Sequence, residues 1–265
     1  VDDIAKPAQF AEQVKARAAQ LAAKSQRPSG VKGIELTPIQ RELGENNVRY
    51  AHVDIQIDRS KRTATWVIHA PTQAMPANGD AAQALGANWA VLQLARELDD
   101  AILHMRTNEP DLGVWVIKTQ GNAQAVLDMD AFLSANANHW LVRETLGLLR
   151  RTLSRLDVSS RSLFALIEEG SCFVGTFFEL ALACDRIYHL ALPDSPSTAP
   201  QIRLTEMNFG SFPMATGQSR LARRFYEEQA PLEAVRSAVG KGLDADAAFK
   251  LCLLYTSPSP RDGLL

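Results

Sequence analysis

Between residues 49 and 250, short apolar runs alternate with segments of helical periodicity, and few folds accommodate this order. The run HVDIQID alternates apolar and polar side chains, turns at RSKR and returns as TATWVIHA, which predicts a β-hairpin. Apolar residues then recur at helical spacing over residues 89–105, 142–156 and 177–185. The apolar runs GVWVIKT, SLFALIE and RIYHLAL predict the remaining strands. The order ββαβαβαβ favours a layered α/β domain over a β-sandwich or a helix bundle.

Both ends of the chain differ from this central part. The segment AQFAEQVKARAAQLAAKS places Phe10, Val14, Ala18 and Leu21 on one helical face, and we expect it to end a preceding unit. After the pattern LDADAAFK, the sequence changes to Ser and Pro without periodicity, as in a translated adapter sequence. We therefore expect an end of a preceding domain over 1–25, a linker over 26–48, a domain over 49–250 and a non-native tail over 251–265.

The composition excludes several classes of protein. With 265 residues, of which 46% are hydrophobic, the chain is long enough to bury a sizeable core. A net charge of -2 gives no general attraction to nucleic acid or to an anionic membrane. Three cysteines are too few for a disulfide framework, and they show no metal-binding spacing. No apolar run approaches the length of a membrane span. We expect a soluble cytoplasmic protein that needs no metal or cofactor.

The stretch ALIEEGSCFVGTFFELALACDRIYHL, residues 165–190, places two glycines and a carboxylate between a buried strand and a buried helix. A strand that enters a helix through Gly175 and Thr176 presents free backbone N–H groups at the positive end of the helix dipole. Such groups can stabilise an oxyanion. The alternative is that Gly170 and Gly175 only permit a tight corner.

This stretch resembles the signature of the crotonase (enoyl-CoA hydratase/isomerase) superfamily, through the motif ELALACD and the downstream motif LTEMNFGSFP. The resemblance implies that Glu179 and Glu206 are the carboxylates that handle the proton and the water. It also implies that Gly175 and Thr176 supply one backbone donor of an oxyanion hole. The sequence departs from the superfamily in two places: the bulky pair Phe177 and Phe178 near the expected substrate channel, and Leu127 and Asp128 where the superfamily has Ala and Gly.

Longer runs resemble a narrower family, the benzoyl-CoA-dihydrodiol lyases. The match is carried by RRTLSRLDVSSRSLFALIEEGSCFVGTFFELALACDR and by LTEMNFGSFPMATGQSRLARRFYEEQAPLEAVR. The resemblance implies a protein of two crotonase-like halves built from repeated ββα units, with this chain as the degenerate second half. It implies cofactor-free hydrolytic opening of 2,3-epoxybenzoyl-CoA to a semialdehyde CoA thioester and formate. The implied partners are the CoA thioester, the missing N-terminal half and a further copy of the protein.

Other candidate residues have simpler interpretations. Glu168 and Glu169 could share a proton, but strand alternation directs them to opposite faces. Ser171 lacks a recognisable base, and Cys172 and Cys184 are typical of small buried residues. The arginines of LGLLRRTLSRLD and SRLARRFYEE could bind CoA phosphates or form a solvated helix face.

Three hypotheses remain open from the sequence: a catalytic half, a structural or dimerising half whose catalytic pocket lies in the other half, and a stand-alone hydratase or isomerase. A catalytic half requires Glu179 and Glu206 to converge on one pocket, and a backbone N–H of Gly175 or Thr176 to be free. A structural half predicts that Glu179 is bound to backbone or arginine partners. It also predicts that bulk at Phe177 and an anion at Asp128 oppose a thioester.

Overall fold

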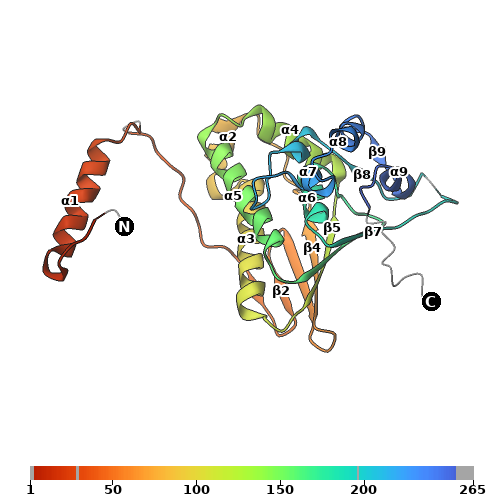
Figure 1. The fold of residues 1–265 in the computed structure, drawn as a ribbon, viewed down its shortest axis with the longest axis horizontal. Helices are drawn as coiled ribbons and strands as arrows, with labels where there is room; N and C mark the ends of the chain where they lie inside the picture. The colour runs from red at the N-terminus through yellow and green to blue at the C-terminus, as the bar shows by residue number, and fades with distance from the viewer. Residues whose placement is uncertain (1–2, 28–29, 196, 255–265) are drawn as a thin grey trace. The chain divides into compact units, whose positions relative to one another are not determined.

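The structure is a computed structural model that describes residues 3–27, 30–195 and 197–254 (Figure 1). The chain divides into two units, residues 1–34 and 35–265. The first unit contains a 3₁₀ turn, η1 (Pro7–Gln9), and the predicted helix, α1 (Phe10–Ala23). The stripe of Phe10, Val14 and Leu21 is exposed, because none of the described residues of this unit covers it.

The second unit is built on a seven-stranded mixed sheet, in which the strands follow one another in sequence order. The strands are β1 (Glu42–Leu43), β2 (Asn47–Arg49), β3 (Val53–Asp58), β4 (Thr63–His69), β5 (Val114–Gln120), β6 (Ser162–Ile167) and β7 (Arg186–His189). Strands β1 to β4 are antiparallel to their neighbours, and β4 to β7 run parallel. The predicted hairpin is confirmed, with Val53 opposite Ile68 and Asp58 opposite Thr63.

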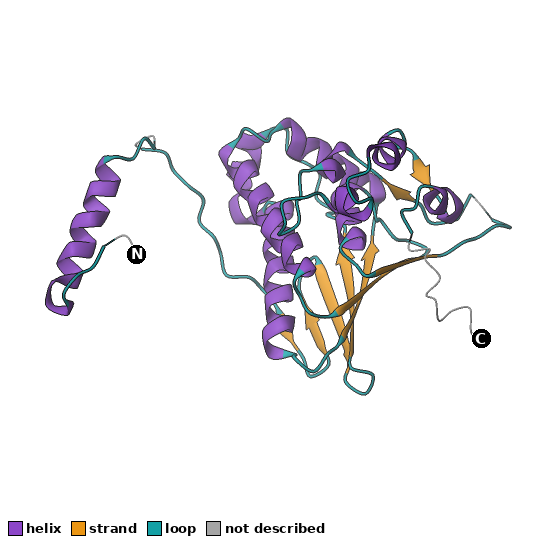
Figure 2. Ribbon diagram, in the orientation of Figure 1, coloured by secondary structure: helices purple, strands orange, loops and turns teal. Residues whose placement is uncertain are grey.

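Helices make the connections that parallel strands require. They are α2 (Gly79–Leu85), α3 (Ala90–Asn108), α4 (Ala123–Ala135), α5 (Trp140–Asp157) and α6 (Gly175–Leu182), with the 3₁₀ turn η2 (Gly86–Asn88). Helices α3 and α5 pack against each other along the sheet, as Figure 2 shows in purple and orange. After β7 come β8 (Ile202–Arg203), η3 (Glu206–Phe209), α7 (Arg220–Arg224), α8 (Gln229–Arg236), β9 (Gly242–Leu243) and α9 (Ala245–Lys250).

The core lies on the side of the sheet where alternate strand residues are fully buried. Trp66 of β4 and Trp115 of β5 pack there with their ring centroids 4.8 Å apart. The intervening residues, such as Val67 and Val116, are only half-buried. Apolar runs without alternation therefore reflect one covered face and one face that is partly open, since side chains alternate along each strand.

The structure places two boundaries differently from the sequence prediction. Strands β1 and β2 lie within the residues expected as linker, and the Arg41 guanidinium binds Asp100 of α3 at 2.6 Å. At the other end, Leu253 is 0% exposed and the Arg224 side chain donates to the Cys252 carbonyl at 2.8 Å. Residues 251–254 thus belong to the folded unit, contrary to the predicted tail. The rest of that tail, 255–265, lies outside the described residues.

Candidate functional site

The turn from β6 into α6 is shaped by two glycines in the left-handed region of backbone space. Gly170 has φ +80° and Gly175, the first residue of α6, has φ +47°. A Cβ on Gly175 would clash with the carboxylate of Asp130 and meet the Thr205 methyl group at 3.0 Å. A glycine is therefore required at the start of α6 by its dihedral and by the side chain beside it.

The carboxylate of Asp130 occupies the N-terminus of α6. The Thr176 N–H donates to Asp130 Oδ2 at 3.0 Å, and the Thr176 hydroxyl donates to Asp130 Oδ1. The Thr205 hydroxyl donates to Asp130 Oδ2 at 2.8 Å. The predicted free backbone donor is thus absent at Thr176, because a side chain from α4 caps it.

Asp130 is 3% exposed, and burial raises its pKa to about 6 against the opposing effect of these hydrogen bonds. The anion expected near this turn is therefore present, but it is not Asp128. Asp128 is exposed and accepts a hydrogen bond from Gln124 at 2.8 Å. Because residues 121–130 include the start of helix α4, two positions along the chain turn the side chain from solvent to the interior.

Glu179 lies in a buried ionic network. Its side chain is 1% exposed, Arg220 Nη1 donates to Oε2 at 2.9 Å, and Asn208 Nδ2 donates to Oε1 at 2.8 Å. Burial raises the Glu179 pKa to about 7, with Arg220 acting in the opposite direction. Arg220 also binds Asp157 at 3.0 Å.

The guanidinium of Arg220 is almost fully used within the protein. Its side chain is 1% exposed, and it donates to the Leu153 and Phe212 carbonyls, both at 3.0 Å. Arg220 therefore fits neither of the two interpretations that the sequence left open for the arginines, CoA binding or a solvated face. It connects α5, α6 and α7.

Glu206 has a different environment. It begins η3, its side chain is 68% exposed, and Arg236 Nη1 lies 2.6 Å from its Oε2. Asn208 of the same turn reaches Glu179, but Glu206 and Glu179 have no hydrogen-bond partner in common among the described residues. The structure brings the two glutamates to one 3₁₀ turn, with one buried and one at the surface.

Helix α6 presents no open side at the predicted site. All its residues from Gly175 to Ala181 are buried, Phe177 and Phe178 included. Around the turn, Cys172 and Cys184 are buried thiols, as predicted, and burial raises the pKa of Cys172 to about 11. Glu168 and Glu169 are exposed, and Glu168 pairs with Lys118 at 2.6 Å, which agrees with a structural role.

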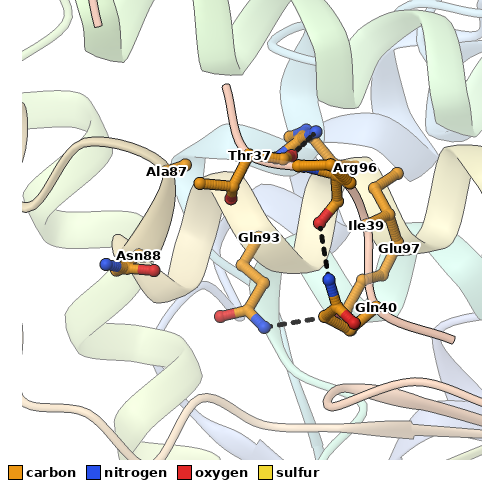
Figure 3. Close-up of a pocket in the computed structure, with 9 residues that line it drawn as sticks. Thr37, Ile39, Gln40, Ala87, Asn88, Gln93, Arg96 and Glu97 are labelled. Atoms are coloured by element: carbon orange, nitrogen blue, oxygen red, sulfur yellow. Dashed lines mark hydrogen bonds between the residues drawn. The ribbon is translucent and has the colours of Figure 1, made fainter. Parts of the chain in front are cut away.

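A small polar cavity lies elsewhere, between the segment before β1 and helix α3 (Figure 3). Its walls include Gln93, which donates to Glu97 at 3.0 Å, and Arg96, which donates to the Thr37 carbonyl at 2.7 Å. The volume is about 100 Å³, well below the several hundred that ligand pockets enclose. None of the four predicted site residues lines it.

Sequence reasoning missed several residues that define this site: Asp130, Arg220, Asn208 and Thr205. Asp130 could have been found, because it shares the apolar face of Val126 and Leu133 at helical spacing. Arg220 could not, since nothing in SRLARR distinguishes it from its neighbours.

No protein-family model matches the chain. A benzoyl-CoA-dihydrodiol lyase of Aromatoleum evansii is 49% identical over 262 residues, which are 99% of this chain and 47% of that protein. The chain thus spans about half the length of this curated relative.

Solved structures share the fold. An enoyl-CoA hydratase of Geobacillus kaustophilus superposes with a TM-score of 0.50 at 18% identity, over 78% of this chain and 68% of that one. An enoyl-CoA hydratase of Bacillus halodurans gives a TM-score of 0.50 at 15% identity, over 81% and 76%. Among the described helices, none is long and apolar enough to cross a membrane. The mixed sheet and its helices form a crotonase-like α/β fold.

Proposed function

We propose that this chain is part of a carbon–carbon lyase of aerobic benzoate degradation. The enzyme would open the ring of 2,3-epoxybenzoyl-CoA by hydrolysis, without a cofactor, to give a semialdehyde CoA thioester and formate. The supporting observation is the 49% identity to a benzoyl-CoA-dihydrodiol lyase along almost the whole chain. The crotonase-like fold is compatible with a CoA-thioester substrate, although a fold alone does not specify a reaction.

The arrangement of the whole protein is part of this proposal. The chain would be the C-terminal half of a two-half protein, with α1 belonging to the end of the first half. This half would be a degenerate second copy of repeated ββα units. Assembly into a homo-oligomer and a cytoplasmic location remain predictions.

Within that enzyme, the role best supported for this half is structural. The observation that carries it is the buried network in which Arg220 and Asn208 occupy both oxygens of Glu179. A general acid or base must reach substrate or water directly or through one water molecule. Glu179 has no exposed edge with which to do so. The catalytic pocket would then lie in the other half.

A second candidate is that this half does carry catalysis. The exposed carboxylate of Glu206 favours it, since this group could contact a substrate. A Glu179 pKa of about 7 also suits proton transfer near neutrality. This alternative requires Arg220 to release Glu179 when substrate binds.

Turnover of 2,3-epoxybenzoyl-CoA by the full-length protein tests both the reaction and the role of this half. We expect Glu179→Gln and Glu206→Gln, combined, to leave turnover within about tenfold of the unmodified protein, because lost acid–base groups typically cost 10²–10⁴-fold. The control is Glu233→Gln, at an exposed position of α8. Circular dichroism must show that the double variant is folded, since Glu179→Gln disturbs a buried ion pair.

Two outcomes would contradict these proposals separately. A thousandfold loss of turnover in the folded double variant would place catalysis in this half. Absence of any ring opening by the unmodified full-length protein would overturn the reaction itself.

A further inference from the structure

We propose that the carboxylate of Asp130 is an internal ligand of an anion site at the N-terminus of α6, and that removing it leaves a site selective for a small free carboxylate such as formate. This inference extends the structural role proposed above, because an occupied anion site is closed to a thioester oxygen. Its test uses no CoA thioester and no turnover.

The first observation is the set of donors around Asp130. A backbone N–H from Thr176 and the hydroxyls of Thr176 and Thr205 all point to the carboxylate. They come from α6 and from the residue before η3, while Asp130 itself lies on α4. Donors from two segments converge on a group from a third, as they would on a bound ligand.

The second observation is that the carboxylate lacks a cationic partner. No Lys, Arg or His of the described residues forms an ion pair with Asp130. The nearest other charge of consequence is an anion, since Asp130 raises the pKa of Glu179 by repulsion between the two carboxylates. The positive end of the α6 dipole and the three donors therefore have to compensate the charge of Asp130. A site that holds a buried carboxylate without a cation is an anion site by construction.

The third observation is the fit of the surroundings to one carboxylate. A Cβ on Gly175 would clash with Asp130, so the start of α6 is moulded around this group. Asp130→Ala keeps the Cβ and removes only the carboxyl group, which leaves a gap of the size of formate. Asp130→Gly removes the Cβ as well, and the gap then matches acetate. Orphaned donors cost free energy, so a free carboxylate of matching size should bind.

A capping role alone makes a different prediction. If Asp130 only ends a helix, its loss destabilises the protein equally in every salt. If it fills an anion site, the loss is reversed by an anion of the right size and charge. Selectivity between formate and acetate in the two variants separates these cases.

The experiment uses the full-length protein and hydrogen exchange of the peptide spanning residues 173–182, which contains the donors of α6. Asp130→Ala is compared in sodium formate and in sodium chloride at equal ionic strength. We expect faster exchange than in the unmodified protein, and an approximately tenfold slowing by formate at ten times its Kd. Acetate should act less on Asp130→Ala than on Asp130→Gly.

The matched control is Asp128→Ala, which removes an exposed carboxylate of the same helix. Asp128→Ala and the unmodified protein should show no difference between formate and chloride. An equal response of Asp130→Ala to both salts overturns the proposal, and so does a formate effect of the same size in the control. If Asp130→Ala is obtained only by refolding, the yield becomes the readout, and equal yields in formate and chloride reject the internal ligand too.

Discussion

Three carboxylates and one guanidinium are gathered around the start of α6. Asp130 and Glu179 are buried, and Asp157 shares Arg220 with Glu179. One cation cannot neutralise three anions, and burial raises the pKa of each carboxyl group. We infer that part of this cluster is protonated near neutral pH. The cluster thereby couples proton binding to folding.

The first prediction concerns pH. The folded pKa values of Asp130 and Glu179 lie at about 6 and about 7, above their ordinary values of 3.8 and 4.5. The folded state therefore binds more protons than the unfolded state between about pH 4 and 7, and the free energy of unfolding falls as pH rises through this window. Urea unfolding from pH 4.5 to 7.5 measures the slope.

Asp130→Asn isolates one group of that slope. Because the amide does not titrate, the variant should gain stability relative to the unmodified protein as pH rises from about 4 to about 6. The gain should approach roughly 3 kcal/mol, because each tenfold difference in proton affinity between the folded and unfolded states is worth about 1.4 kcal/mol. Parallel stability curves for the two proteins would contradict a raised pKa at Asp130.

The second prediction concerns Arg220. Arg220→Met leaves Glu179 and Asp157 without their cation, and breaking a buried pair typically costs about 3–5 kcal/mol. The cost should be smaller at pH 5 than at pH 7.5, because Glu179 is protonated at the lower pH. Arg223→Met, in the same helix α7, is the control. A loss below about 1 kcal/mol in urea unfolding at pH 7.5 would rule out an essential network.

Helix α6 is positioned by its first turn more than by helix propensity. It has eight residues, which is too short for stability in isolation, and its buried surface contacts α4, α7 and η3. The start of α6 also carries the Asp130 carboxylate on the side where Gly175 has no side chain. Substitutions at this turn should therefore act through the anion site as well as through the backbone.

The third prediction compares two glycines. Gly175→Ala combines a positive φ with a clash against Asp130, whereas a Cβ on Gly170 meets open space at φ +80°. Positive φ costs about 1–2 kcal/mol for a residue with a Cβ, so Gly170→Ala should lose that amount and Gly175→Ala clearly more. Thermal unfolding of both variants gives the difference.

A double variant identifies the cause. Adding Asp130→Ala to Gly175→Ala removes the clashing group, so the two losses of stability should be less than additive. Additive losses would mean that the strain at Gly175 does not come from Asp130.

The folded unit has one well-covered face of its sheet and extends further along the chain than the predicted domain. Strands β4 to β7 are parallel, an arrangement that is usually covered on both faces. The segment after α9 adds Leu253 to the core and its Cys252 carbonyl to Arg224. We therefore place the end of the folded unit beyond the predicted residue 250.

The fourth prediction tests this end. Leu253→Ala should cost about 2–5 kcal/mol, as for other fully buried leucines, because the side chain is 0% exposed. Leu251→Ala, at a half-buried position two residues earlier, should cost less. Equal and small effects of the two variants on urea unfolding would support the predicted tail from residue 251 instead.

Local patterns sufficed for the hairpin β3–β4, for helices α3 and α5, and for strands β5 and β6. These elements could be predicted because the spacing of apolar residues directly reflects which side of a strand or helix faces the core. The same patterns predicted that Cys172 and Cys184 would be buried. They failed for the short strands β1 and β2, in which only Val48 is a buried apolar residue.

The site depends on contacts between residues far apart in the sequence. Asp130 meets Thr176 and Thr205 across 46 and 75 positions, and Arg220 meets Glu179 across 41. Motif resemblance located Glu179 and Gly175, but a motif specifies residue types and not their partners. Whether a carboxylate is free to react or bound to an arginine depends on which segments pack beside it, and that follows from the long-range packing of α4, α6 and α7.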